Sequence, residues 1–102
     1  MGKVMKEIKL SSNEIMELCA DFKALSDEGR LKIILLLLSG KKSVNAISES
    51  VGLSQSATSH QLRILKDARI LKCERVGNEN YYFLSDEHVK TVILTAVEHL
   101  GC

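Results

Sequence analysis

The stretch SVNAISESVGLSQSATSHQLRILKDAR, residues 43–69, decides the fold of this chain. Its apolar residues recur every three or four positions over residues 43–51 and again from Ser54 to about Ala68, as they do along one face of a helix. Gly52 ends the first of these helices, and Ser54 caps the second. Two helices joined by a tight turn that contains glycine form a helix-turn-helix unit.

The sequence that follows, ILKCERVGNENYYFL at residues 70–84, has the pattern of two short strands instead. We expect these strands to cover residues 70–76 and 81–84, with a Gly/Asn turn at residues 77–80. The cluster of Tyr and Phe residues in this chain lies in the second strand. A helix-turn-helix followed by a β-hairpin is a winged helix, in which the hairpin is the wing.

Three further helices are expected around this unit. One starts within Ser11-Ser12-Asn13-Glu14 and carries an apolar stripe that ends at Leu25. The next starts at Ser26-Asp27 and is apolar nearly all round, so we expect a buried central helix that Gly40 ends. The last is capped by Ser85-Asp86 and has apolar residues at i, i+3, i+4, i+7, i+8 and i+11. The predicted fold class is therefore mainly α with a β-hairpin wing.

Length and composition predict one small domain. The chain has 102 residues, of which 45% are hydrophobic and 26% are charged, which suits one packed core. We expect residues 1–10 to form a flexible tail and residues 11–102 to form the domain. A core of this size stays small, so dimerisation is an expected source of added stability.

Composition also excludes some classes of protein. The longest apolar run, residues 33–38, is far shorter than the roughly 18 residues that cross a membrane. The three cysteines are odd in number and scattered, and the N-terminus lacks the pattern of a signal peptide. We therefore expect reduced thiols and a cytoplasmic protein rather than a secreted or membrane protein.

The second helix of the helix-turn-helix has an exposed face of short hydrogen-bonding side chains and a few cations, which can read base edges in the major groove. The residues expected on this face are Ser56, Thr58, Ser59, His60, Gln61, Arg63 and Lys66. The chain has a net charge of only +1, but residues 54–75 hold five Lys and Arg against Asp67 and Glu74, a net of +3 that suits contact with phosphates. An ordinary solvated helix has a similar composition. The residues expected to contact DNA are Gln55, Ser56, Ser59, His60, Arg63 and, in the wing, Arg75.

Four potential metal ligands lie at the two ends of the last helix. His99 and Cys102 are three residues apart, and Asp86 and His88 flank the helix start, so each pair can converge. The two histidines are about 16 Å apart along a helix, too far for one ion to reach both. Two helices packed antiparallel about a two-fold axis would join the first pair of one chain to the second pair of the other, giving sites suited to Zn²⁺. The alternative is that the two histidines and Cys102 are ordinary helix-end residues.

Several motifs together resemble a known family. They are Leu25-Ser26-Asp27 with Arg30-Leu31 at the buried helix, Leu53-Ser54-Gln55-Ser56-Ala57-Thr58-Ser59-His60-Gln61-Leu62 in the helix-turn-helix, and Arg75-Val76-Gly77 with Tyr81-Tyr82 in the wing. With the order of the expected elements, they resemble the ArsR/SmtB family of small dimeric winged-helix repressors over residues 14–102.

The resemblance implies a homodimeric transcriptional repressor that binds a palindromic operator in double-stranded DNA and is released by a metal ion. One subset of the family senses zinc-like ions through Asp-x-His and His-x-x-His/Glu on the terminal helix. Asp86-Glu87-His88 and His99-Leu100-Gly101-Cys102 match this pattern, with Cys102 in place of His or Glu. The resemblance therefore implies Zn(II) or a similar ion as regulatory ligand, with the Cys102 thiolate or terminal carboxylate as fourth ligand. The family's other site uses cysteines in the first helix of the helix-turn-helix, where this chain has none.

Two other classes of protein are alternatives. A thiol-based repressor of the same fold would sense oxidants or reactive sulfur species, but residues 27–39 hold no cysteine, which leaves Cys19 with Cys102 as a pair. Cys19 lies on an apolar stripe, so we expect it in the core, and we expect Cys73 to have no special role. A zinc enzyme would need an open coordination position and a substrate cleft. Ligands at a dimer seam offer no such cleft, so we expect no catalytic activity.

Overall fold

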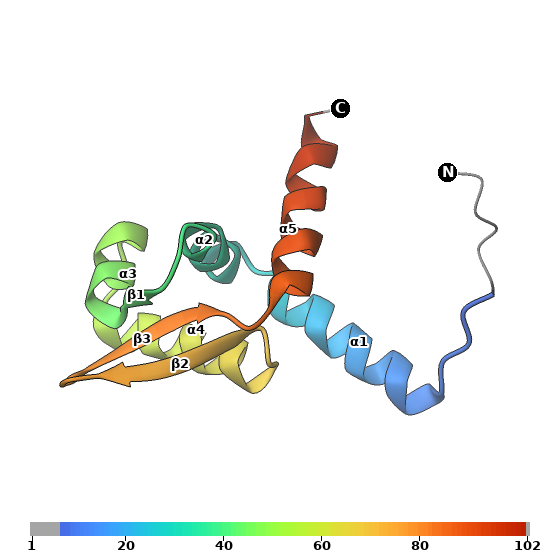
Figure 1. Cartoon of the computed structure of the whole chain (residues 1–102), viewed down its shortest axis with the longest axis horizontal. Helices are drawn as coiled ribbons and strands as arrows, with labels where there is room; N and C mark the ends of the chain where they lie inside the picture. The colour runs from blue at the N-terminus through green and yellow to red at the C-terminus, as the bar shows by residue number, and fades with distance from the viewer. Residues whose placement is uncertain (1–6, 102) are drawn as a thin grey trace.

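Five helices and a small antiparallel sheet make up the computed structural model, which describes residues 7–101 (Figure 1). In chain order the elements are α1 (Ser12–Leu25), α2 (Glu28–Leu37), β1 (Lys42–Ser43), α3 (Val44–Val51), α4 (Gln55–Asp67), β2 (Leu71–Val76), β3 (Glu79–Leu84) and α5 (Glu87–Leu100). The helices α3 and α4 form the helix-turn-helix, and β2 and β3 form the wing, so the predicted fold class is confirmed. Of the predicted tail, residues 7–10 lack regular secondary structure and residues 1–6 lie outside the described part.

Each of these five helices begins where a side-chain oxygen accepts a backbone N–H three residues further on. The capping residues are Ser11, Asp27, Ser43, Ser54 and Asp86, as the sequence predicts. The predicted end of α2 is wrong, because the helix stops at Leu37, before Gly40. Beyond this point the backbone hydrogen bonds span three residues instead of four. The Leu38 N–H donates to the Leu35 carbonyl, and the Gly40 N–H donates to the Leu37 carbonyl.

The turn between α3 and α4 is locked by a glycine and a buried serine. Gly52 adopts a left-handed conformation with φ +71°, which a residue with a Cβ rarely does. Its N–H donates to the Ser48 carbonyl at 3.0 Å, and the Ser48 hydroxyl donates to the Leu53 carbonyl at 2.8 Å. These bonds satisfy the end of α3 and fix the direction in which α4 leaves it.

The sheet differs from the predicted hairpin in two ways. It has a third strand, β1, which pairs with β3 at Lys42 and Ser43, so the strand order is β1-β3-β2. The hairpin turn has two residues, because Val76 pairs with Glu79 and Gly77 has a φ of +63°. The predicted four-residue turn is therefore wrong, and β3 begins at Glu79. Neither feature has an apolar signal: β1 is only two residues long, and the tip of the wing is polar and exposed.

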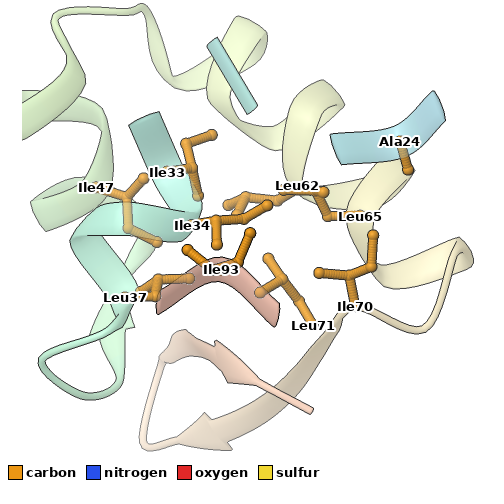
Figure 2. Packing of buried hydrophobic residues seen from close by; sticks show 10 residues of the cluster. All are labelled: Ala24, Ile33, Ile34, Leu37, Ile47, Leu62, Leu65, Ile70, Leu71 and Ile93. Atoms are coloured by element: carbon orange, nitrogen blue, oxygen red, sulfur yellow. The ribbon is translucent and has the colours of Figure 1, made fainter. Parts of the chain in front are cut away.

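The core forms where α2, α3, α4, β2 and α5 meet, and Figure 2 shows its side chains pointing toward one another. Its members are Ala24, Ile33, Ile34, Leu37, Ile47, Leu62, Leu65, Ile70, Leu71 and Ile93. The expectation that α2 is buried all round is wrong, because Leu31 and Leu35 are 38% and 41% exposed. Thr58 is also not on the polar face of α4 but fully buried, since it lies four residues before Leu62 and shares its side of the helix.

Thr58 allows a test of the core. Its hydroxyl oxygen is buried and has no hydrogen-bond partner among the described residues. We expect Thr58→Val, which keeps the shape and the β-branch, to raise the free energy of unfolding by about 1 kcal/mol, because it removes an unsatisfied polar group. Urea unfolding at one fixed protein concentration measures this. Thr91→Val, on an exposed part of α5, is the control, and an equal gain in both variants would contradict the assignment.

The first and last helices contribute little to this core. Each has one buried residue, Ala24 in α1 and Ile93 in α5. Both extend away from the remaining elements (Figure 1), and the radius of gyration of 15.5 Å exceeds the roughly 13 Å typical of 100 residues. Their exposed apolar side chains are Ile15, Met16, Leu18 and Phe22 in α1 and Val92, Leu94, Val97 and Leu100 in α5. The predicted apolar stripes are present, but most of each stripe lies uncovered in the single chain.

Candidate functional site

The polar face of α4 is presented to solvent as the sequence predicts. Ser59 and His60 lie three and four residues after Ser56, and Arg63 lies four and three residues after them. All four are exposed, so they form one face of the helix. The opposite side is held in the core by Thr58, Leu62 and Leu65, which fixes the outward direction of the polar face. The other two predicted DNA contacts, Gln55 at the start of α4 and Arg75 in β2, are exposed as well.

Neighbouring elements affect Gln55 and the surroundings of Arg63. The Gln55 amide donates a hydrogen bond to Asn45 Oδ1 of α3, which ties the first turn of α4 to the helix before it. Burial raises the pKa of Tyr82 in β3, and its hydrogen bond with Cys73 acts in the same direction, whereas the charge of Arg63 opposes the shift. Tyr82 therefore stays neutral at physiological pH and adds no negative charge beside Arg63.

The charge pattern around α4 and the wing favours an anionic partner. Glu74 is one of the two acidic residues within residues 54–75. It forms an ion pair with Lys41, with an Nζ–Oε1 distance of 2.7 Å. That pairing offsets the negative charge on the wing. Arg69 is paired with α1 instead, since its Nη2 lies 3.9 Å from Glu17 Oε1. Arg63 on α4 and Arg75 in β2 remain exposed, where they can contact phosphates.

Gln61 has a role that the sequence does not predict. It is expected on the polar face of α4, but it is half-buried. Its Oε1 accepts a hydrogen bond from Arg30 Nη1 of α2 at 3.0 Å. The two residues are 31 positions apart. No local spacing pattern connects them, so only the fold shows the contact.

The predicted metal ligands lie at opposite ends of α5. Asp86 Oδ1 lies 3.7 Å from His88 Nδ1 and also accepts the Val89 N–H at 3.1 Å. The Val89 N–H lowers the pKa of Asp86, and the charge of His88 adds to this. His99 is exposed in the last turn of the helix, and Cys102 lies outside the described residues.

Residues 7–101 contain no group of three or more His, Cys, Asp or Glu side chains that could hold a metal ion. The two ends of α5 are separated by the length of an unbroken helix, so a single chain cannot bring both histidines to one ion. The four-ligand site stays a prediction that depends on a second copy of the chain.

A groove runs beside the first of these ligand pairs. It has a volume of about 600 Å³ and lies between α1, the residues that follow α4, and the start of α5. Its apolar lining includes Leu18, Phe22 and Val92, and its edge includes Asp86 and His88. The uncovered apolar surface of α1 and α5 is therefore continuous with one half of the predicted metal site.

The thiols differ from expectation in one respect. Cys19 is exposed on α1, so its predicted place in the core is wrong, because α1 extends away from the core for most of its length. Cys73 is half-buried in β2 beside Tyr82.

Within residues 7–101, none of the helices is long and apolar enough to cross a membrane.

Comparisons with known proteins agree with this geometry. Residues 27–72 match the family described as bacterial regulatory protein, arsR family. A transcriptional repressor SmtB homolog from Synechocystis is 35% identical over 91 residues, which are 89% of this chain and 69% of that protein. A homolog of the cadmium resistance transcriptional regulatory protein CadC from Staphylococcus aureus is 38% identical over 91 residues, which are 88% of this chain and 75% of that one.

Among solved structures, the homodimeric winged helix-turn-helix DNA-binding domain Mb0332 from Mycobacterium bovis shares the fold. It has a TM-score of 0.82 and 24% sequence identity, and the match covers 96% of this chain and 90% of that one.

Proposed function

The chain belongs to the arsR family of bacterial regulatory proteins, and from that premise we propose that it is a homodimeric repressor that a Zn²⁺-type ion releases from DNA. Members of this family are DNA-binding transcriptional regulators rather than enzymes. The proposed repressor binds a palindromic operator in the cytoplasm. The observation that carries the proposal is the outward polar face of α4, which stands on a buried opposite side and exposes Arg63, with Arg75 exposed in the neighbouring wing.

The proposed DNA contacts follow from that face. The side chains of Ser56, Ser59 and His60 are short enough for α4 to enter the major groove, where they meet base edges. The guanidinium of Arg63 extends from the same face, and the exposed side chains of Gln55 and Arg75 are the proposed contacts to phosphates or base edges. A second copy related by a two-fold axis would place the same face on the other half of a palindrome.

The proposed dimer surface consists of α1 and α5. Their apolar side chains are exposed in the single chain, and a continuous uncovered apolar surface of this kind marks an interface. The groove between them has an apolar lining and an acidic edge that includes Asp86. A second copy of the chain suits this surface, because each copy supplies the same two unpartnered helices and a two-fold axis matches a patch with itself.

The ion would be held by Asp86 and His88 of one chain with His99 and Cys102 of the other. The donor chemistry fits: carboxylate oxygen, imidazole nitrogen and thiolate sulfur are the ligands that Zn²⁺ takes, four at a time. Asp86 and His88 already lie close together and at the edge of the proposed interface. When bound, the ion would supply a cross-link between the copies and so favour one dimer arrangement over another.

Regulation follows from linkage between the two sites. If the ion favours a dimer in which the two α4 helices are wrongly spaced for the operator, DNA must weaken ion binding by the same factor. Operator affinity measured with EDTA and then with Zn²⁺ tests the proposal, because only a metal-relieved repressor loses affinity when the ion is added.

Arg63 offers a test of the DNA face itself. We expect Arg63→Ala to weaken operator binding about tenfold and to reduce the slope of log Kd against log salt by about one, because one phosphate or base contact by a cation is lost. Fluorescence anisotropy over a salt series gives both numbers. Lys32→Ala removes the same charge from an exposed position of α2 and is the control. Equal effects of the two substitutions would mean that Arg63 acts only through the overall charge.

A further inference from the structure

The guanidinium of Arg30 joins three helices. It extends from α2, where its Nε donates to the Ala24 carbonyl at 2.7 Å and its Nη2 lies 3.5 Å from the Lys23 carbonyl. Both carbonyls belong to the last turn of α1, where the negative end of the helix dipole attracts a cation. Its Nη1 donates to Gln61 Oε1 of α4 at 3.0 Å. The planar fork of arginine allows one side chain to make all these contacts at once.

The surroundings hold this contact in place. The Arg30 side chain is only 17% exposed, and Asp27 Oδ2 accepts the Arg30 N–H at 3.0 Å and lies 4.0 Å from its Nη1. Gly29 leaves room beside them, since a Cβ there would lie 3.4 Å from Gln61 Nε2 and 3.3 Å from Asp27 Oδ2. Buried, charge-assisted hydrogen bonds of this kind are stronger than neutral ones.

Gln61 points toward the body of the protein and away from the DNA face. It lies three residues after Thr58 and four residues before Leu65, both of which are fully buried, so it shares their side of α4. The proposed DNA contacts lie on the other side of the same helix. Gln61 therefore connects the recognition helix to α1 without being a DNA contact.

This connection matters because α1 has little else to hold it. Ala24 is its one buried residue among those described, and most of its apolar side chains lie on the proposed interface with a second copy. A change in how two copies pack would move α1. The Lys23 and Ala24 carbonyls are the part of α1 that touches Arg30 and, through it, α4.

We propose that Arg30 and Gln61 form a joint that sets the orientation of α4 relative to α1, and so relative to the second copy. The proposal rests on the proposed repressor function and names the part of the chain that transmits the dimer arrangement to the DNA-binding face. Arg30 and Gln61 are positioning residues in this account. They act on operator affinity and on its response to metal, and neither touches DNA or the ion.

The test uses two substitutions of Gln61 in the full-length dimer. Gln61→Met keeps the length of the side chain and removes the oxygen that accepts from Arg30. Gln61→Glu keeps an accepting oxygen and strengthens the bond with the guanidinium. Arg30→Lys keeps the charge and removes the fork. Glu28→Gln/Lys32→Gln removes an exposed ion pair of 3.6 Å from the same helix α2 at constant net charge, and serves as the control.

Operator Kd is measured for each variant with EDTA and with Zn²⁺, and folding is checked by thermal unfolding. We expect Gln61→Met and Arg30→Lys to weaken metal-free binding about tenfold, or about 1.4 kcal/mol, and to bring the ratio of the two Kd values closer to one. Gln61→Glu and the control are expected to stay within about threefold of the unaltered protein.

Three results would overturn the joint. Metal-free binding by Gln61→Met within twofold of the unaltered protein would show that the contact does not position α4. A large loss in Gln61→Glu but not in Gln61→Met would show that Gln61 faces the phosphates instead. An unchanged metal response in a weakened Gln61→Met would show a role in folding alone. If Zn²⁺ has no effect on the unaltered protein, the metal-sensing proposal fails separately. The metal-free affinities alone then test whether Arg30 and Gln61 orient α4.

Discussion

Zn²⁺ is expected to weaken operator binding by the reduced protein by roughly ten- to a hundredfold, and the double variant His88→Ala/His99→Ala is expected to bind equally well with and without it. The physical reason is the position of the two histidines at opposite ends of α5. Removing both takes one nitrogen ligand from each half of the proposed site, and the remaining carboxylate and Cys102 cannot hold the ion tightly. Fluorescence anisotropy with a labelled promoter fragment at fixed salt measures the change.

The control for this prediction is Cys19→Ser. Cys19 is exposed on α1 and outside the proposed ligand set, so its removal is expected to leave the Zn²⁺ response intact. Tight operator binding that ignores Zn²⁺ in the unaltered protein would rule out metal sensing through α5. Loss of binding on mild oxidation, prevented by Cys19→Ser, would instead establish the thiol-based repressor, for which an exposed Cys19 has the access that a core cysteine lacks.

Replacing Val92 with glutamate is expected to separate the dimer and to lower operator affinity by more than a hundredfold. Val92 is 47% exposed in the single chain and lines the groove between α1 and α5, so a second copy would bury the new carboxylate without a partner, at a cost of several kcal/mol. A monomer presents one α4 to the operator in place of two. Sedimentation equilibrium gives the molar mass, and anisotropy at metal-free conditions gives the affinity.

Thr91→Glu is the matched control, because it adds the same charge to the neighbouring position. Thr91 is exposed and lies four residues after Glu87, on a side of α5 that already carries a carboxylate. It is expected to stay dimeric and to bind the operator within a few fold of the unaltered protein. A dimeric Val92→Glu with normal affinity would place the interface elsewhere on the molecule.

Helix starts and the helix-turn-helix could be predicted because their causes are local. Ser43, Ser54 and Asp86 cap helices through hydrogen bonds that span three residues, and Gly52 is required at its turn by its own backbone angle. Such features depend on neighbours in the sequence. A single chain therefore shows them without knowledge of the rest of the fold.

Several features that are not predicted from the sequence depend on distant contacts. The two residues of β1 form a strand only because β3 lies beside them. Thr58 has the composition of a polar face, but its spacing from Leu62 places it on the side of α4 that packs into the core. Gln61 differs from its exposed neighbours through one bond to α2. Tertiary packing outweighs local preference at each of these positions.

The candidate site was predicted unevenly for the same reason. The six proposed DNA contacts are exposed as expected. For the five in α4, the helical period separates them from the core, whereas Arg75 lies in the exposed outer half of β2. The approach of Asp86 to His88 also follows from the short spacing across a helix start. Whether these ligands meet His99 and Cys102 depends on an interface between two chains, and no spacing within one chain determines that.

The exposed helices α1 and α5 also link the folding of this protein to its abundance. Each has one buried residue in the single chain, so in the proposed dimer they would gain most of their apolar burial from the partner, and mass action would enter the folding equilibrium. Dilution of such a dimer would lower the melting temperature, and a newly made chain would stay less stable until it met a second one. In a cell, surplus unpaired copies would be the fraction most open to proteolysis, which would keep the pool of repressor close to the pool of complete dimers.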